Sequence, residues 1–236
     1  MSKIMAIAER EFRAYFASPL AYVIAAMFIA IVGYLFSLII YHTRQANFQP
    51  LFQNMAVMFL LIVPALTMRL IAEERKTGTI ELLLTSPIRD HDLVLGKYLS
   101  ALGYLLFLMA LTLVFPLGLC LTTSLDWGML FTGYLGSFLL GASFLAVGLW
   151  ASSLTSNMII AAMVSFAVSL LLWLLPSAGQ VFGGTAGDVL TYLSVMNHQD
   201  KLGRGIIESS DLIFYLSFIV VSLFLTVRSV ETYHWR

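Results

Sequence analysis

The chain has 236 residues, of which 60% are hydrophobic and 11% charged, and its formal net charge at pH 7 is zero. A soluble domain averages about 25% charged residues, so the composition excludes an ordinary soluble fold and indicates a membrane protein. The neutral balance argues against nucleic acid as a partner. The single cysteine, Cys120, excludes an intrachain disulfide and most metal clusters.

Residues 2–18 predict an amphipathic helix ahead of the first membrane span. One face carries, at helical spacing, Ile4, Met5, Ala8, Phe12, Tyr15 and Phe16. The opposite face carries Glu9, Arg10 and Arg13. Ile7 falls off the apolar stripe, and Ser18-Pro19 ends the helix. Such a helix lies in the membrane interface. It serves either as an anchor alone or also as a contact for a cytoplasmic partner, and the sequence supports both interpretations.

Six apolar stretches are each long enough, at about 20 residues, to cross a bilayer as a helix. They are residues 21–41, 52–71, 97–122, 129–151, 157–175 and 212–229. Pro64 and Pro116 lie inside the second and third stretches and predict kinks there. The predicted fold is therefore all-α, a single membrane domain over residues 1–236 with six spans.

The distribution of basic residues predicts that both termini lie in the cytoplasm. With that orientation, the cytoplasmic side holds ten of the 13 Lys and Arg residues, and the outer side holds Arg44, Lys201 and Arg204. Trp127, Trp150 and Trp173 fall at span ends, as interfacial tryptophans do. The segment between the second and third spans is then cytoplasmic.

That segment reads IAEERKTGTIELLLTSPIRD over residues 71–90. Gly78 ends one helix, Thr77 or Thr79 can cap the next, and Pro87 stops it. The short helix between them places Ile80, Leu83 and Leu84 on one face. It could be a simple linker, but three leucines between stiff ends favour a docking element for a soluble subunit.

The string EERKTGTIELLLTSPI resembles the signature of type-2 ATP-binding-cassette (ABC) transporter permeases. The pattern that follows the second span in that family is E-E-[RK]-x-x-G-T-x-E-x-L-L-x-[ST]-P-[IVL]. It is matched here by Glu73, Glu74, Arg75, Gly78, Thr79, Glu81, Leu83, Leu84, Ser86 and Pro87. The short chain, with almost no outer domain after the first span, is most similar to the gliding-motility and nitrous-oxide-reductase-accessory branch.

The resemblance implies a division of labour in which this chain is not an enzyme and binds no metal or other cofactor. Two ATP-binding subunits, which hold ATP and Mg²⁺, would dock below a pair of permeases formed by two copies of this chain or by this chain and a similar one. Residues 77–88 would be the coupling helix and residues 2–18 the interface helix. The implied docking residues are Arg75, Lys76, Gly78, Thr79, Ile80, Glu81, Leu83, Leu84 and Pro87. The implied interface-helix residues are Glu9, Arg10, Phe12 and Arg13.

Residues 176–211, before the last span, are long for a connection without function. The resemblance suggests that part of this outer loop dips back into the membrane as re-entrant helices. His198, Asp200 and Lys201 suggest a metal or proton-relay site, but a solvated loop or a contact for an accessory outer protein is the favoured interpretation.

The spans contain no Asp or Glu near their middles, which argues against an ion-coupled transporter. Gly133, Ser137 and Gly141 form a row of small residues that suits helix packing better than a transport pathway. An intramembrane protease with an E-E-x-x-x-R motif is the rival enzyme, but Gly78 stands where that motif needs arginine. The chain also lacks the G-x-x-x-x-G-K-[ST] loop that would bind ATP.

These observations predict a multi-pass permease in a bacterial or archaeal plasma membrane, in contact with membrane lipids. We expect it to act as the membrane subunit of an ATP-driven exporter. The alternative is a force-transmitting or anchor subunit that acts on an accessory outer protein without moving a solute. The sequence does not separate the two, and it does not identify a substrate.

Overall fold

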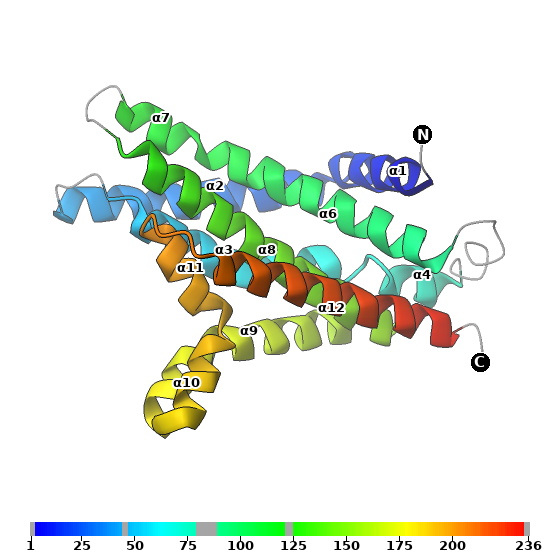
Figure 1. The fold of residues 1–236 in the computed structure, drawn as a ribbon. Coiled ribbons are helices and arrows are strands. Elements are labelled where there is room, and N and C mark those ends of the chain that lie inside the picture. Colours follow the sequence, from blue (N-terminus) through cyan, green and yellow to red (C-terminus); the bar gives the residue numbers. More distant parts are fainter. Residues whose placement is uncertain (1–2, 44–46, 79–88, 121–124, 234–236) are drawn as a thin grey trace.

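The computed structural model describes residues 3–43, 47–78, 89–120 and 125–233, and every regular element within them is a helix (Figure 1). In chain order these are α1 (Lys3–Ala17), α2 (Pro19–Thr43), α3 (Gln49–Thr67), α4 (Ala72–Thr77), α6 (Asp90–Thr112), α7 (Val114–Cys120), α8 (Trp127–Leu154), α9 (Met158–Phe182), α10 (Gly184–Tyr192), α11 (Val195–Gly203) and α12 (Ser209–Tyr233).

Six helical segments of the described chain are long and apolar enough to cross a membrane, which confirms the predicted number. They are Pro19–Thr43, Gln49–Thr77, Asp90–Cys120, Trp127–Leu154, Met158–Val181 and Ser209–Thr232. Each overlaps one predicted stretch. The second consists of α3 and α4, and the third consists of α6 and α7.

The fourth span, α8, is the centre of the bundle. In its most apolar window 78% of the residues are buried, whereas the corresponding figure is 22% for α2 and α12 and 17% for α9. Its glycines allow this central position, because a Cβ at Gly133 would lie 2.0 Å from the Phe52 ring and one at Gly141 would lie 2.8 Å from Leu105. The row of small residues in α8 therefore packs against α3 and α6, as favoured from the sequence.

Proline interrupts one of the three spans that contain it away from their first turn. Pro116 has no N–H to pair with the carbonyl of Thr112, and α6 ends at Thr112 before α7 begins at Val114. The predicted kink in the third span is thus a break between two helices. Pro64 and Pro176, by contrast, lie inside the continuous helices α3 and α9.

The segment from 176 to 211 is largely helical. Helix α9 continues through Pro176 to Phe182, and the Ser194 hydroxyl donates at 3.5 Å to the Leu172 carbonyl that the proline leaves without its helical partner. Helix α10 folds back against α9, with Gly179 and Gly187 in close approach. Helix α11 packs against α8 and α9. An outer position and a dip into the membrane stay predictions for this segment.

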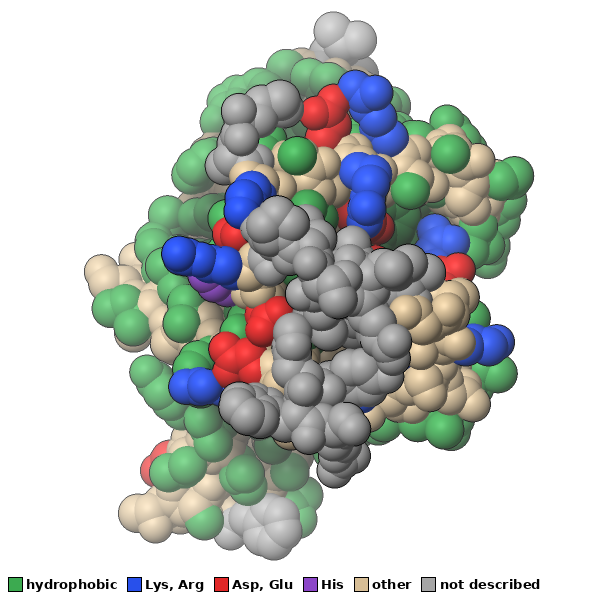
Figure 2. All heavy atoms as spheres, turned by 90° about the vertical axis from the view of Figure 1, so that its right-hand side faces the viewer, with side chains coloured by type: hydrophobic (Ala, Val, Ile, Leu, Met, Phe, Trp, Pro, Cys, Tyr) green, Lys and Arg blue, Asp and Glu red, His purple; other side chains and the backbone are tan. Residues whose placement is uncertain are grey.

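The beginning of α1 and the end of α12 lie at one end of the bundle, together with α4 (Figure 1). Acidic and basic side chains gather on this face, whereas apolar side chains dominate the surface behind it (Figure 2). This arrangement places the predicted cytoplasmic elements together, at the end that a membrane would leave in water.

Candidate functional site

Helix α4, whose sequence is AEERKT, is the described part of the motif that suggested a docking element. It begins without a capping side chain of its own, because Ile71 at its N-terminus has no hydrogen-bond acceptor. Ser152 of α8 supplies the acceptor instead. Its buried Oγ accepts hydrogen bonds from the backbone N–H groups of Ile71 at 3.1 Å and Ala72 at 3.0 Å, and it donates to the Met68 carbonyl at 3.2 Å. The start of α4 is therefore fixed by the central helix.

One side of α4 is held by a buried lysine from α6. The Lys97 ammonium lies 2.7 Å from Glu74 Oε1 of α4 and 3.5 Å from Glu11 Oε1 of α1. The lysine side chain is 2% exposed, so a single buried cation joins three elements. We call Glu11, Glu74 and Lys97 the lysine side of α4. Removing one partner of such a buried pair leaves an uncompensated charge, which makes this link strong but intolerant of substitution.

Two arginines lie near the lysine side, and Arg10 acts directly on one of its carboxyl groups. Burial raises the pKa of the Glu11 carboxyl. The charges of Lys97 and Arg10, and their hydrogen bonds to this carboxyl, lower the pKa by more than burial raises it, so it lies below its ordinary value. Arg69 lies over the Tyr15 ring, 5.6 Å from its centroid. A pocket of about 410 Å³ opens here, and its lining includes Glu73 and Arg69 together with the three residues of the lysine side.

The opposite side of α4 is held by the next residue along the chain. The Arg75 guanidinium donates to the backbone carbonyl of Ser153 in α8, and the Ser229 hydroxyl of α12 donates to the same carbonyl at 3.1 Å. We call Arg75, Ser153 and Ser229 the arginine side of α4. A carbonyl oxygen has two lone pairs and can accept both hydrogen bonds. Consecutive residues, Glu74 and Arg75, thus tie α4 to different halves of the bundle.

The end of α4 confirms the prediction that Gly78 breaks the helix. Gly78 has φ +72°, in the left-handed region, and a Cβ there would meet no atom of the described residues within 4 Å. Its backbone conformation, and not a close neighbour, therefore requires glycine. The predicted docking residue Lys76 is exposed beside it. The other predicted docking residues, Thr79, Ile80, Glu81, Leu83, Leu84 and Pro87, lie outside the described residues.

Helix α1 packs against the beginning of α6 through two glycines spaced two turns apart. A Cβ at Gly96 would lie 2.7 Å from Ile7, and one at Gly103 would lie 3.0 Å from the Phe12 ring. The predicted position of Ile7 off the apolar face is therefore wrong. Ile7 is buried while Met5 is 53% exposed, because the covered face includes Ala8 and Tyr15 and extends to the flank with Ile7, whereas Met5 lies on the other flank. The sequence pattern alone does not say which flank a neighbouring helix will cover.

The charged residues predicted for the interface helix point in two directions. Glu9 and Arg13 form an exposed ion pair one turn apart. Arg10 pairs instead with Glu11 at 2.7 Å, next to the lysine side of α4. The outward pair is free of the protein core and available to a partner or to lipid, whereas Phe12 and Glu11 belong to the contact with α6.

The aromatic residues of α1 complete its attachment. Tyr15 stacks on Tyr104 of α6 with ring centroids 5.2 Å apart, and its hydroxyl donates to the Leu66 carbonyl of α3 at 3.4 Å. Burial raises the pKa of Tyr15, so the hydroxyl stays protonated and keeps its role as a donor. Tyr104 in turn donates to the Ala21 carbonyl of α2 at 2.6 Å. Helix α1 is thereby joined to the first three spans.

A family model described as ABC-2 family transporter protein matches residues 5–229, almost the whole chain. The chain belongs to this family. It is accordingly the membrane permease subunit of an ABC transporter, a kind of transmembrane subunit that is generally non-catalytic and normally works with an ATP-binding subunit. No curated protein sequence matches the chain.

Two serines and one lysine of this ABC-2 permease were not predicted as site residues. Ser152 and Ser153 directly follow the fourth predicted span, and Lys97 is the first residue of the third. A lysine inside a segment long enough to cross the membrane is costly unless it is paired, so Lys97 together with Glu74 was the available signal. Nothing in the sequence pairs Ser152 with the start of α4, because 80 residues separate the two.

At the other end of the permease, His198 is a structural residue. It is 1% exposed, its Nδ1 lies 2.5 Å from Asp211 Oδ1, and its Nε2 lies 2.9 Å from the Tyr192 carbonyl. The ring also stacks on Phe214. These contacts join α10, α11 and α12, and they show that the expectation of a solvated loop is wrong for this residue. Among the described residues there is no group of His, Cys, Asp and Glu that could hold a metal ion.

Proposed function

We propose that this ABC-2 permease converts closure of an ATP-binding partner into movement of its spans, and that it works as an exporter. Residues 77–88 would be the coupling helix that enters the partner, and α1 would be the interface helix beside it. Two ATP-binding subunits would carry ATP and Mg²⁺, and a second copy of the chain or a similar permease would complete the pathway. The proposed setting is a bacterial or archaeal plasma membrane with both termini in the cytoplasm.

The observation that carries this proposal is the double attachment of α4. A force applied beyond Gly78 reaches α4 directly, since α4 ends at that residue. From α4 the force passes through Glu74 to α6 and α1, and through Arg75 to α8 and α12. A coupling element needs such differential contacts with the parts that move, because a ligand shifts a conformational equilibrium only through contacts that differ between the states.

The decisive test is affinity purification of the tagged chain from native membranes. We expect an ATP-binding subunit to co-purify in stoichiometric amount and the complex to hydrolyse ATP. Leu83→Asp should abolish this association, because it places a charge on the proposed docking face, while membrane insertion and the unfolding temperature stay unchanged. Ser210→Asp, in the first turn of α12 and outside the proposed docking elements, is the control for an added negative charge.

Retention of the ATP-binding subunit by Leu83→Asp would contradict the coupling-helix assignment. The same preparation separates the two modes of action that the sequence leaves open. Stimulation of ATP hydrolysis by a candidate solute supports export, whereas stimulation only by an accessory outer protein would support force transmission.

A further inference from the structure

A second pocket lies at the same end of the bundle, on the arginine side of α4. Its volume is about 420 Å³, close to that of the pocket beside Lys97. Its lining comes from α4, from the end of α8 and from the last turns of α12. We call it the arginine pocket, and its lining residues are Arg75, Trp150, Leu154, Leu225, Arg228, Ser229 and Thr232.

The two pockets differ in charge. Three carboxylates, those of Glu11, Glu73 and Glu74, line the pocket beside Lys97 and outnumber its two basic groups. The arginine pocket has two guanidinium groups, and no acidic residue is among its described lining. An anion is the complementary occupant, since guanidinium groups match the paired oxygens of phosphate and carboxylate.

The contacts of the two arginines hold their guanidinium groups in place. Arg75 donates to the Ser153 carbonyl, which fixes its position against α8. Arg228 lies over the Phe224 ring, 5.2 Å from its centroid, and pairs with Glu231 at 2.8 Å. That last pair is exposed, with side-chain exposures of 64% and 39%, and exposed pairs contribute little. A stronger anion can therefore share or displace Glu231.

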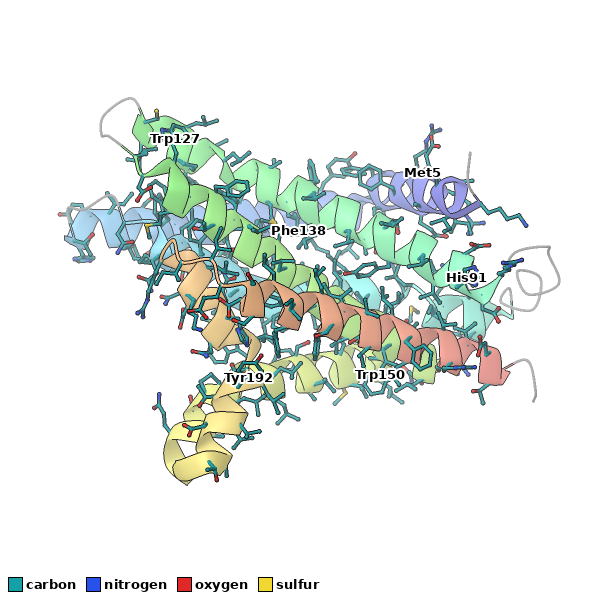
Figure 3. All side chains as sticks on the ribbon, viewed as in Figure 1. Met5, His91, Trp127, Phe138, Trp150 and Tyr192 are labelled. Atoms are coloured by element: carbon teal, nitrogen blue, oxygen red, sulfur yellow. The ribbon has the colours of Figure 1, made fainter. Side chains whose placement is uncertain are left out.

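The remaining walls indicate where the anion comes from. Leu154 and Leu225 are 49% and 43% exposed, so the pocket continues into apolar surface that faces the hydrocarbon of a membrane. Trp150 lies beside them near the end of α8 (Figure 3), where an indole suits the boundary between headgroups and acyl chains. Basic groups next to apolar surface at the end of two spans match a phospholipid, with its phosphate at one end and its chains at the other.

We propose that the arginine pocket binds an anionic phospholipid, with the headgroup phosphate on Arg75 and Arg228 and an acyl chain along Leu154 and Leu225. The lipid belongs to the leaflet next to the chain termini, which is the cytoplasmic leaflet in the proposed orientation. Because Arg75 belongs to α4, the occupant touches the same element that the proposed coupling helix moves. The binding itself needs only membrane insertion and does not depend on an ATP-binding partner.

Trp150 makes the proposal measurable. The full chain, with Trp127, Trp173 and Trp235 changed to Phe, is placed in vesicles that contain brominated phosphatidylglycerol or brominated phosphatidylcholine. Bromine atoms quench the fluorescence of a nearby indole. Because the brominated lipid is present in both leaflets, the result does not depend on the orientation of the chain in the vesicle. We expect phosphatidylglycerol to quench Trp150 with an apparent binding constant at least about fivefold that of phosphatidylcholine, and Arg228→Gln to remove about fivefold of this preference.

Arg13→Gln is the matched control, because Arg13 is also an exposed arginine paired with a glutamate at the same end of the bundle. It should leave the preference unchanged, and Arg228→Lys, which keeps the charge, should retain part of it. Equal quenching by the two lipids, or a preference that survives Arg228→Gln, would overturn the proposal. So would relief of quenching by excess inorganic phosphate, which would indicate a site for a soluble anion.

The outcome is independent of the proposed function when co-purification is measured on the same variants. Arg228→Gln should keep the ATP-binding subunit while losing the lipid preference. Loss of that subunit with an unchanged lipid preference would assign the arginine pocket to the docking surface and overturn the lipid site. Failure of the Leu83→Asp test would leave the quenching result as it stands.

Discussion

The two sides of α4 use different chemistry to hold the same short helix. On the lysine side, Glu74 and Glu11 share the buried ammonium of Lys97, so the attachment depends entirely on side-chain charges. On the arginine side, Arg75 and Ser229 share the backbone carbonyl of Ser153, which is present whatever side chain stands there. A buried ionic link is lost when one partner changes, whereas the Ser153 carbonyl keeps one hydrogen bond when either of its two donors is removed. We therefore expect α4 to be bound tightly to α1 and α6 and more adjustably to α8 and α12.

Removing the lysine tests this comparison most severely. Lys97→Met should lower the free energy of unfolding by about 3–5 kcal/mol, because the carboxylates of Glu11 and Glu74, which are 19% and 15% exposed, lose the cation that they share. Thermal unfolding in detergent, followed by tryptophan fluorescence, measures the loss. Lys76→Met removes an exposed lysine from the same helix and should change stability by less than about 0.5 kcal/mol. Equal effects of the two variants would contradict the importance of the lysine side.

Ser152 belongs to neither side but fixes the start of α4, on which both sides depend. Ser152→Ala should cost about 2 kcal/mol, because two buried backbone N–H groups at the start of α4 lose their acceptor. Ser153→Ala is the control, since the Ser153 hydroxyl donates only within its own helix and the carbonyl that holds Arg75 remains. If thermal unfolding shows Ser153→Ala to be as destabilised as Ser152→Ala, the role of the Ser152 hydroxyl at the start of α4 is contradicted.

Gly78 ends α4 and joins it to the proposed coupling helix, so a force from that helix reaches both sides of α4 through this residue. Gly78→Ala should cost about 1–2 kcal/mol, because alanine is strained at φ +72° although nothing in the described part of the chain obstructs its Cβ. Gly118→Ala is a matched control in α7, where the space is equally open and φ does not lie in the left-handed region. Helical alanine there should be neutral or slightly stabilising. Thermal unfolding compares the two, and no difference between them would remove the conformational explanation for Gly78.

The smallest effect is expected on the arginine side. Ser229→Ala should cost about 0.5–1 kcal/mol, because Arg75 still donates to the Ser153 carbonyl after the hydroxyl is gone. Ser217→Ala, which removes an exposed hydroxyl from the same helix, is the control for α12. A loss of stability as large as that of Lys97→Met would show that the two sides of α4 are equally rigid.

Hydrophobic runs and turn residues made the spans and several helix ends predictable. Apolar stretches of about 20 residues require a helix in a membrane because only internal hydrogen bonds can satisfy the backbone there. Gly78 and Ser18-Pro19 were predicted as helix ends for local reasons, and both end a helix in the structure. The expected helical interruption near Pro116 also follows from one missing N–H. These features depend on residues close together in the chain.

The candidate site depends on contacts that the chain brings together over long separations. The sequence indicated that residues 73–78 matter, but not that Ser152 fixes the start of α4 or that Lys97 joins Glu74 to Glu11. It did not show that Ile7 and Phe12 would lie against Gly96 and Gly103. Periodicity identifies an apolar face without naming its neighbour, and a polar residue does not reveal its partner.

The sequence by itself thus determined that this is a membrane protein, that it has six apolar helices and that it belongs to the ABC-2 transporter family. Each of these follows from composition or from one continuous motif. Only the tertiary structure decided that α8 occupies the centre and that Glu74 and Arg75, adjacent in the chain, bind different helices of the bundle. The physical reason is that helix packing selects among many compatible faces, and buried polar groups then take the partners that the packing brings within reach.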